Sequence, residues 1–330
     1  MIDNLIGKIV KEDIVAYNGV CLLKKGTLLQ KDHVTLLVRN RIFLRQEDTI
    51  NQEESIIREA TEQMKEIFEF TRDSNQVPLQ EIEDVMAPTV QQLASNHDIF
   101  SLLSHLLEKD DYTYRHNIGV AVLSAMIGTW TNLTGEQLSS LTVAALLHDI
   151  GKVRISEEIL NKPGKLTDEE YACIKRHAVY GYEILQNTKA APDIYAIVAL
   201  QHHEREDGTG YPHRLPSAQI DFFSKIVAIA DVFHAMTSKR VYREAIPFYE
   251  VMNEMHKERF GKLHPELLHV FIHRMMLSLL GRPVLLSDGR EGIVRFIHPS
   301  HPTLPIIESG SEYIDLHKDP FIQIQKIILE

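Results

Sequence analysis

Apolar residues recur at helical spacing over most of the chain. After residue 51, this spacing places six of them on one helix face: Ile56, Ile57, Ala60, Met64, Ile67 and Phe68. Pro78 interrupts the pattern, which resumes at Ile82, Val85, Met86, Val90 and Leu93. We therefore predict connecting helices over residues 51–107 and a strongly helical domain over residues 108–280.

The two ends of the chain have a β-type pattern instead. Near the N-terminus, the runs Ile14–Tyr17 and Val20–Leu23 flank Asn18-Gly19, a dipeptide that favours a two-residue hairpin turn because both residues readily adopt positive φ. Near the C-terminus, strand-like runs lie at 284–286, 292–296, 313–316 and 322–327. The sequence thus predicts a mainly α protein with a small mixed α/β domain over residues 1–50 and a small β extension over residues 281–330.

Charge and composition restrict the possible partners. The chain of 330 residues has 35 basic and 46 acidic side chains, so its net charge of −11 disfavours a nucleic-acid polymer or an anionic membrane surface as partner. Ten acidic residues lie between Glu53 and Asp84, which favours a solvated helix face over a dimerisation or partner helix. With two cysteines, no secretory signal and no long apolar stretch, we expect a cytoplasmic protein without membrane insertion.

Two motifs indicate a metal site: His148-Asp149-Ile-Gly-Lys152, and the run from His202-His203 to Gly-Tyr-Pro212. Imidazole and carboxylate ligands suit borderline first-row divalent metals better than Mg²⁺ or Ca²⁺. The predicted ligands are His116, His148, Asp149, His177, His202, His203 and Asp231. Seven ligands exceed what one ion takes from protein, so we predict two divalent ions, bridged by Asp149 because it is the only carboxylate adjacent to a histidine ligand. Such a pair can hold a hydroxide between the ions, which suits phosphoester hydrolysis.

The helices around these ligands have recognisable ends. Thr167-Asp-Glu-Glu170 has the form of a capping box and starts a helix that we expect to carry His177. Apolar runs lead into His202 and into Asp231, so we expect buried helices to end at these ligands and hold them rigidly.

Cationic and aromatic side chains near the ligands are candidates for substrate binding. Lys152 is assigned to the scissile phosphate, where a lysine acts as a compact positive charge. Arg240 and Arg243 are assigned to the outer phosphate or the sugar–phosphate backbone, because a guanidinium binds two phosphate oxygens in a bidentate manner. Tyr211 offers a ring that can stack on a base. Asp207, Gly208 and Gly210 are expected to shape the loop rather than contact substrate.

The ordered set of motifs resembles the HD-GYP domain, a branch of the HD phosphohydrolase superfamily, over roughly residues 100 to 280. The matching stretches are Tyr112-Thr-Tyr-Arg-His116, His148 to Lys152, Lys175-Arg-His177 with Gly181, His202 to Pro212, and Ala230-Asp231 to Arg243. The resemblance implies an all-helical HD-type bundle that hydrolyses cyclic di-GMP to pGpG, and in some members to GMP, with a bi- or trinuclear centre often containing iron or manganese. It also implies bacterial second-messenger signalling, with a GGDEF-type cyclase and a second copy of the chain as partners.

Two positions depart from the family pattern. Members with a third metal have a glutamate one helical turn before the first histidine, where this chain has Tyr112, so the resemblance favours two ions. The family usually has a second aspartate three residues after the one matching Asp231, where this chain has His234. The exchange is mild if this position only supports the helix, and it lowers substrate affinity if the position orients Arg240 or Arg243.

Three functions therefore remain open. The leading hypothesis is a dinuclear phosphodiesterase that hydrolyses cyclic di-GMP. The second is a low-turnover signalling effector that binds a cyclic dinucleotide, suggested by His234 and by the two flanking domains. The third keeps the chemistry but acts on cyclic GMP-AMP, since phosphate contacts carry no information about the base.

Overall fold

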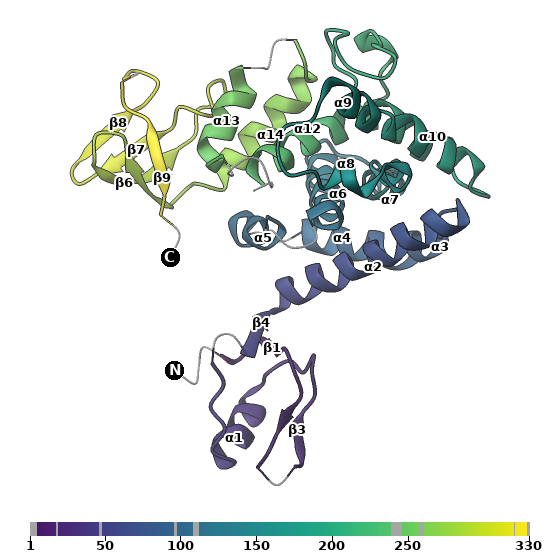
Figure 1. Ribbon diagram of the computed structural model, residues 1–330. Helices are drawn as coiled ribbons and strands as arrows, with labels where there is room; N and C mark the ends of the chain where they lie inside the picture. The colour runs from purple at the N-terminus through teal and green to yellow at the C-terminus, as the bar shows by residue number, and fades with distance from the viewer. Residues whose placement is uncertain are drawn as a thin grey trace. The chain divides into compact units, whose positions relative to one another are not determined.

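The computed structural model describes residues 5–17, 19–45, 48–95, 98–107, 112–238, 246–257, 261–319 and 321–328. Figure 1 shows the helices and strands along the chain. The chain divides into two compact units, Met1–Gln63 and Met64–Glu330, and the division falls within helix α2 (Gln52–Ser74). Each unit is described separately below.

The first unit combines short antiparallel strands with one helix. Its elements are β1 (Lys8–Val10), β2 (Ile14–Val15), β3 (Cys21–Leu23), α1 (Lys31–Arg39) and β4 (Thr49–Asn51). Strand β1 pairs with β4, and β2 pairs with β3, so the expected hairpin is present, although Asn18 of its turn lies outside the described residues. Val10, Leu23, Leu29 and Leu37 form a small core between strands and helix. The mixed α/β character expected here is confirmed.

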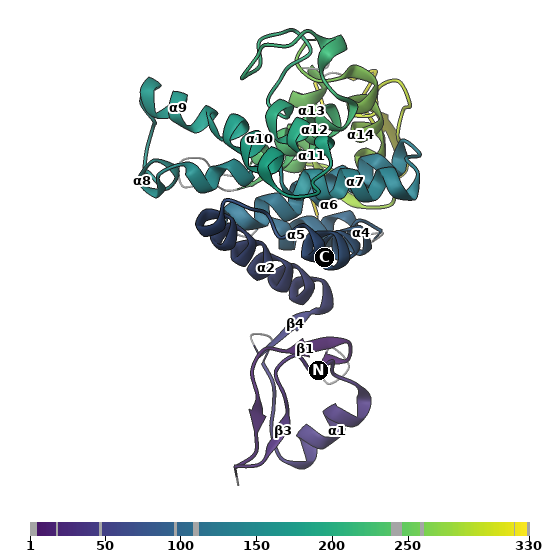
Figure 2. The same ribbon diagram turned by 90° about the vertical axis from the view of Figure 1, so that its right-hand side faces the viewer.

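The second unit is predominantly helical. After α2 come α3 (Leu79–Glu81), the π-helical η3 (Ile82–Met86), α4 (Ala87–Ala94), α5 (Ile99–Leu106), α6 (Tyr112–Trp130), α7 (Gly135–Leu146), the 3₁₀ helix η4 (Ile150–Arg154), α8 (Glu157–Leu160), α9 (Asp168–Lys175), α10 (His177–Asn187), α11 (Asp193–Gln201), the 3₁₀ helix η5 (Ser217–Gln219), α12 (Phe222–Thr237), α13 (Phe248–Lys257) and α14 (Pro265–Leu277). Helix α6 is buried on all sides from Arg115 to Gly128, because α4, α5, α7, α12 and α14 pack around it. Figure 2 shows α6 at the centre of this arrangement, with α8 and α9 at one side.

The predicted apolar faces agree closely with burial. Ile57 and Met64 of α2 are fully buried, as are Ile82, Met86 and Val90 after the interruption at Pro78. Ile56 is only partly buried, and Val85 departs from the prediction, with 45% of its surface exposed. It lies within the π-helical turn η3, which changes the spacing of side chains around the helix axis and turns Val85 toward solvent.

Two predicted helix ends differ from the structure. The capping box at Thr167 is present, but its helix α9 ends at Lys175, and His177 is the first residue of the next helix, α10. The helix that precedes Asp231 does not end there, because α12 continues to Thr237. His202, in contrast, immediately follows the end of α11, as expected.

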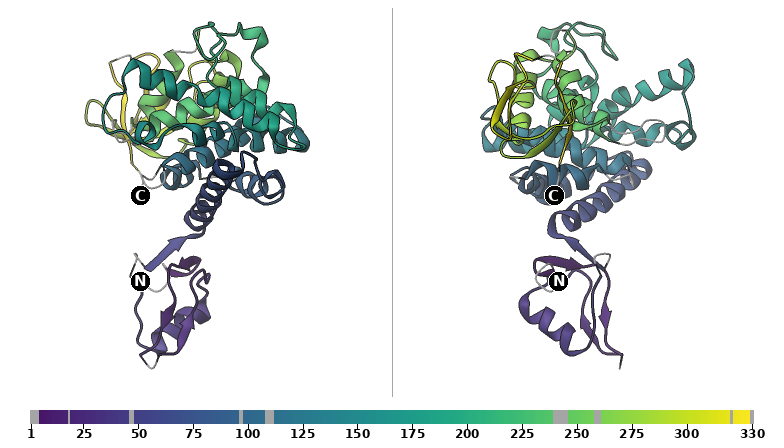
Figure 3. Two further views of the ribbon diagram at one scale, coloured as in Figure 1. Left: turned by 45° about the vertical axis from the view of Figure 1, so that its right-hand side comes forward. Right: turned by 90° about the vertical axis from the view of Figure 1, so that its left-hand side faces the viewer.

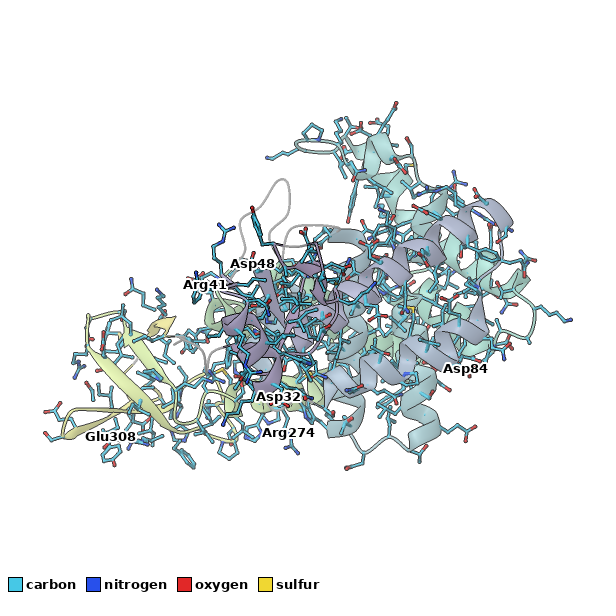
Figure 4. The ribbon with its side chains drawn as sticks, turned by 90° about the horizontal axis from the view of Figure 1, so that it is seen from below. Asp32, Arg41, Asp48, Asp84, Arg274 and Glu308 are labelled. Carbon is cyan, nitrogen blue, oxygen red and sulfur yellow. The ribbon has the colours of Figure 1, made fainter. Side chains whose placement is uncertain are left out.

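The C-terminal part of the second unit is an antiparallel sheet. Its strands are β5 (Pro283–Leu286), β6 (Glu291–Phe296), β7 (Ile306–Ser309), β8 (Glu312–Asp315) and β9 (Ile324–Ile327), in the order β8-β7-β6-β5-β9. Glu308, labelled in Figure 4, lies on β7 and pairs with Arg295 of β6. The sheet adjoins α13 (Figure 3), where the Tyr249 hydroxyl donates a hydrogen bond of 2.6 Å to the Thr303 carbonyl. The β extension is therefore confirmed, with β7 as a strand that the sequence pattern did not predict.

A membrane-spanning segment was not expected. Among the described residues, every helix is too short or too polar to cross a lipid bilayer.

Candidate metal centre

The predicted ligands converge from five helical segments of the second unit. His116 lies in α6, the His148-Asp149 pair follows α7, and His177 begins α10. His202 and His203 follow the last residue of α11, and Asp231 lies in α12. The segments pack on one another in pairs, including α6 with α7 and α12, and α10 with α11. The packed helices therefore bring together side chains that are separated by up to 115 positions, from 116 to 231.

Asp149 lies between two sets of imidazoles. Its Oδ1 is 3.2 Å from His177 Nε2 and 3.9 Å from His202 Nε2. Its Oδ2 is 3.5 Å from His148 Nε2 and 3.8 Å from His116 Nε2. The two oxygens of one carboxylate thus face different pairs of histidines.

These contacts define two overlapping groups of candidate ligands. One comprises Asp149, His177, His202 and His203, and the other comprises His116, His148 and Asp149, with the ligand atoms of each group within 4.8 Å of one another. Asp231 lies against both groups, with its Oδ1 3.1 Å from His116 Nε2 and its Oδ2 3.7 Å from His203 Nδ1. All seven predicted ligands are therefore brought together.

The protein environment sets the protonation state of these groups. Burial lowers the pKa of His116 and His177, and it lowers the pKa of His202 and His203 well below 6.5. Burial alone would raise the pKa of Asp149, but the Lys152 ammonium and the neighbouring histidines outweigh it and hold the pKa of this carboxyl well below 3.8. At neutral pH these four imidazoles are therefore neutral and Asp149 is ionised, the forms that bind metal.

Three of the histidines are oriented by backbone carbonyls near helix ends. The Nδ1 atoms of His148, His177 and His202 lie 2.8 Å from Ala145 O, 2.7 Å from Ile174 O and 2.9 Å from Ala199 O, respectively. A carbonyl partner requires a proton on Nδ1, and the neutral ring then presents the lone pair of Nε2. All three Nε2 atoms accordingly point to the centre of the cluster.

Gly151 holds the Asp149 segment close to α10. A Cβ atom at Gly151 would lie 2.0 Å from the His177 carbonyl oxygen and 2.4 Å from the Gly181 nitrogen, both of which are backbone atoms. Glycine is therefore required at this position of the His-Asp-Ile-Gly-Lys motif, because any side chain there would prevent the backbones of η4 and α10 from approaching each other. This role of Gly151 was not predicted from the sequence, although Gly181, on the opposite segment, is a second glycine that permits a close backbone approach.

The loop after His203 is organised by its own side chains. The buried Glu204 carboxylate accepts hydrogen bonds from the backbone nitrogens of His213, at 2.7 Å, and Leu215, at 3.0 Å. Asp207 accepts from Thr209 N at 2.9 Å, which agrees with a loop-shaping role. A Cβ at Gly210 would lie 2.4 Å from Glu204 Cα, so Gly210 permits the close return of the chain. Glu204 was not anticipated as a loop-organising residue.

The structure describes two of the four residues predicted to bind substrate. The Lys152 ammonium is ion-paired with Asp149 Oδ2, with 19% of the lysine side chain exposed. The Tyr211 ring stacks on His203 with ring centroids 4.6 Å apart, and the Lys175 ammonium lies 5.9 Å from the centroid of Tyr211. Arg240 and Arg243 lie outside the described residues.

The donor set fits a divalent metal centre. His148 Nε2 is fully buried and has no hydrogen-bond partner among the described residues, so a buried lone pair points into the cluster. A buried hydrogen-bond acceptor without a partner lowers the stability of the fold unless a ligand binds it. A set of imidazole nitrogens and carboxylate oxygens suits first-row divalent metal ions. The His/Asp cluster is thus able to hold metal ions.

The fold and this cluster define the class of the protein. A family model described as an HD domain matches residues 82–267, more than half of the 330 residues, and the chain therefore belongs to the HD domain family. The HD-type helical fold implied by the resemblance is confirmed.

Several curated proteins are similar in sequence. "Cyclic di-GMP phosphodiesterase PA4108" of Pseudomonas aeruginosa is 36% identical over 58% of this chain and 46% of its own length. "3'3'-cGAMP-specific phosphodiesterase 1" of Vibrio cholerae is 36% identical over 63% of this chain and 49% of its own length. "Cyclic di-GMP phosphodiesterase response regulator RpfG" of Xanthomonas campestris pv. campestris is 42% identical over 52% of this chain and 46% of its own length. The chain thus spans about half the length of these relatives.

Among solved structures, "Bd1817, a HDG"Y"P protein from Bdellovibrio bacteriovorus" aligns with 82% of this chain and 96% of its own chain. The TM-score of that alignment is 0.48, at 19% sequence identity.

Proposed function

We propose that this protein is a metal-dependent phosphodiesterase that hydrolyses cyclic di-GMP to pGpG or GMP. The observation that carries the proposal is the position of Asp149, whose two oxygens face separate histidine groups. We assign His116, His148, Asp149, His177, His202, His203 and Asp231 as ligands of two divalent ions, with iron or manganese as the metal. Bound there, the ions would supply Lewis acidity that activates water and neutralises the charge on the phosphate.

The protein side chains have separate tasks in this reaction. Hydrolysis forms a bond from the water oxygen to phosphorus and breaks the bond from phosphorus to the 3′-oxygen, which takes up a proton. The Lys152 ammonium, held beside Asp149 at the edge of the cluster, binds a non-bridging oxygen of the scissile phosphate as a compact positive charge. The buried imidazoles keep their Nε2 atoms fixed, so little reorganisation accompanies the reaction.

Tyr211 and the two arginines complete the proposed substrate site. Tyr211 borders the cluster through its stack on His203, and we assign its aromatic ring to contact with a base. Arg240 and Arg243 are assigned to the outer phosphate on the basis of sequence alone.

Cyclic GMP-AMP is the second candidate substrate. It is favoured by the similarity to the Vibrio cholerae protein that is named as specific for 3'3'-cGAMP. The proposed cluster contacts phosphate, which both dinucleotides contain, and phosphate contacts do not distinguish bases. A GGDEF-type cyclase and a second copy of this chain are the protein partners that we infer from the family resemblance.

The proposal is tested with protein reconstituted anaerobically with Fe(II) or Mn(II), by measuring metal content and separating the products chromatographically. We expect two metals per chain and formation of pGpG or GMP from cyclic di-GMP. Loss of an outer hydrogen-bond partner of a metal ligand typically costs roughly 10–100-fold in activity. Asp149→Asn changes a proposed ligand itself, so turnover should fall by more than this. Asp84→Asn is the matched control, because Asp84 is exposed on η3 (Figure 4) and should leave turnover unchanged.

Three results would contradict this proposal. Metal-loaded protein that binds cyclic di-GMP without cleaving it would instead support the effector hypothesis. Faster cleavage of cyclic GMP-AMP than of cyclic di-GMP in a direct competition assay would identify cyclic GMP-AMP as the preferred substrate. Wild-type turnover in Asp149→Asn would exclude the bridging role.

A further inference from the structure

His116 differs from the other oriented histidines in its hydrogen-bond partner. It lies within the second turn of α6 rather than at a helix end. The carbonyl three residues before it, Thr113 O, accepts a hydrogen bond of 3.0 Å from the Asn117 side-chain amide. The Nδ1 atom of His116 instead lies 3.0 Å from Nδ1 of His234, a residue of α12.

The ring geometry fixes which nitrogen of His116 is available to a ligand. His116 Nε2 faces the cluster, 3.1 Å from Asp231 and 3.8 Å from Asp149. If Nε2 provides the lone pair, the neutral ring has its proton on Nδ1 and donates it to His234 Nδ1. His234 must then be the acceptor in this pair and has its own proton on Nε2.

The surroundings of His234 are built to hold this ring. His234 is 1% exposed, and the Ser238 hydroxyl lies 3.1 Å from the same Nδ1 atom. In α6, a Cβ atom at Gly119 would lie 2.1 Å from His234 Nε2 and 2.2 Å from its Cδ2. Only the absence of a side chain at Gly119 leaves room for the imidazole at this position.

We propose that His234 is a positioning residue that orients His116 toward the metal centre, and that Gly119 provides the space for it. This inference rests on the ligand role that the proposed function gives to His116. Helix α12 thereby contributes both a proposed ligand, Asp231, and, one turn later, the imidazole that orients a second proposed ligand. Outer partners of this kind set the ring orientation and the basicity of a metal-bound histidine.

The test compares metal affinity across substitutions at position 234, measured by competition with a chelator in the absence of nucleotide. His234→Ala should weaken binding about 10–100-fold. His234→Asn places an amide oxygen close to the position of Nδ1 and should retain affinity within about threefold of wild type, whereas His234→Leu, which has no acceptor, should behave like alanine. Thr237→Val is the matched control, since Thr237 is a buried residue of α12 whose hydroxyl donates to the Phe233 and His234 carbonyls of its own helix, and metal affinity should not change.

The contact with Gly119 is tested by a double-mutant cycle in urea denaturation. Gly119→Ala should lower the unfolding midpoint in the wild-type background and lower it much less in the His234→Ala background, where the ring is absent. Equal effects in both backgrounds would contradict the packing argument.

The outcomes separate this inference from the proposed function. Wild-type metal affinity in folded His234→Ala, or equal loss in the asparagine and leucine variants, would overturn the orienting role while leaving the phosphodiesterase intact. Metal binding by the wild type without turnover of cyclic di-GMP would overturn only the proposed reaction. A wild-type chain that binds no divalent ion would overturn both.

Discussion

Gly151 shows how one residue type can determine the geometry of the proposed metal centre. The backbone of η4 approaches α10 so closely that Asp149 Oδ1 comes within 3.2 Å of His177 Nε2. The groups opposite Gly151 are backbone atoms of His177 and Gly181, which cannot rotate away as a flexible side chain can. A larger residue must therefore move one of the two segments that contribute ligands.

We predict that Gly151→Ala lowers the free energy of unfolding by about 1–3 kcal/mol and lowers the metal content of the purified protein. Chemical denaturation and elemental analysis measure the two effects. Gly135→Ala is the control, because a Cβ there meets nothing within 4 Å and should change stability by no more than about 0.5 kcal/mol. Equal stability of the two variants would show that η4 and α10 can separate without cost.

Helix starts and apolar faces were predictable because they depend on neighbours in sequence. The capping box at Thr167, the buried face of α2 and the approach of α11 to His202 all follow from local patterns. The His-Asp and His-His motifs, with the histidines and the aspartate spaced around them, predicted the ligand set, which the structure brings together around Asp149.

Features that depend on packing between distant segments were not predictable. The division between α9 and α10 is one example, because Lys175 and His177 are almost adjacent in sequence and no proline or glycine separates them. The contact of His116 with His234 joins positions 118 residues apart, and no local pattern gives its geometry. The strand β7 was missed because its apolar run, Ile306-Ile307, is short.

Helix α9 should depend measurably on its capping box. The Thr167 hydroxyl accepts from Glu170 N at 3.2 Å, and the Glu170 carboxylate accepts from Thr167 N at 2.7 Å. Thr167→Ala should destabilise the protein by about 1 kcal/mol, whereas Thr167→Ser, which keeps the hydroxyl, should cost less. Thermal unfolding measures both variants, and identical melting temperatures would indicate that α9 contributes nothing to global stability.

The stability of the metal-free protein should depend on pH. Burial holds the pKa of His202 and His203 well below 6.5 in the folded state. Below about pH 6.5 the unfolded chain therefore binds more protons at these two residues than the folded protein does. The stability associated with these neutral rings is fully present above about pH 6.5 and is lost as pH falls below it. The pKa of Asp149 lies below 3.8, so this carboxylate stays ionised over the same interval.

We therefore expect the melting temperature of metal-free protein to fall between pH 7.5 and pH 5.5. Calorimetry in the presence of a chelator measures this change. The matched variant is His33→Gln, because His33 is a partly buried residue of the first unit that does not belong to the cluster, so the fall in melting temperature should persist in it. A flat profile in the wild-type protein would mean that the buried imidazoles do not control its acid sensitivity.

The stack of Tyr211 on His203 has a mechanical consequence. The Tyr211 backbone nitrogen also donates to the His203 carbonyl at 3.2 Å, so ring and main chain join the Gly-Tyr-Pro loop to the same histidine. Any displacement of this loop would therefore also displace His203, because the two residues are joined both through their rings and through the main chain.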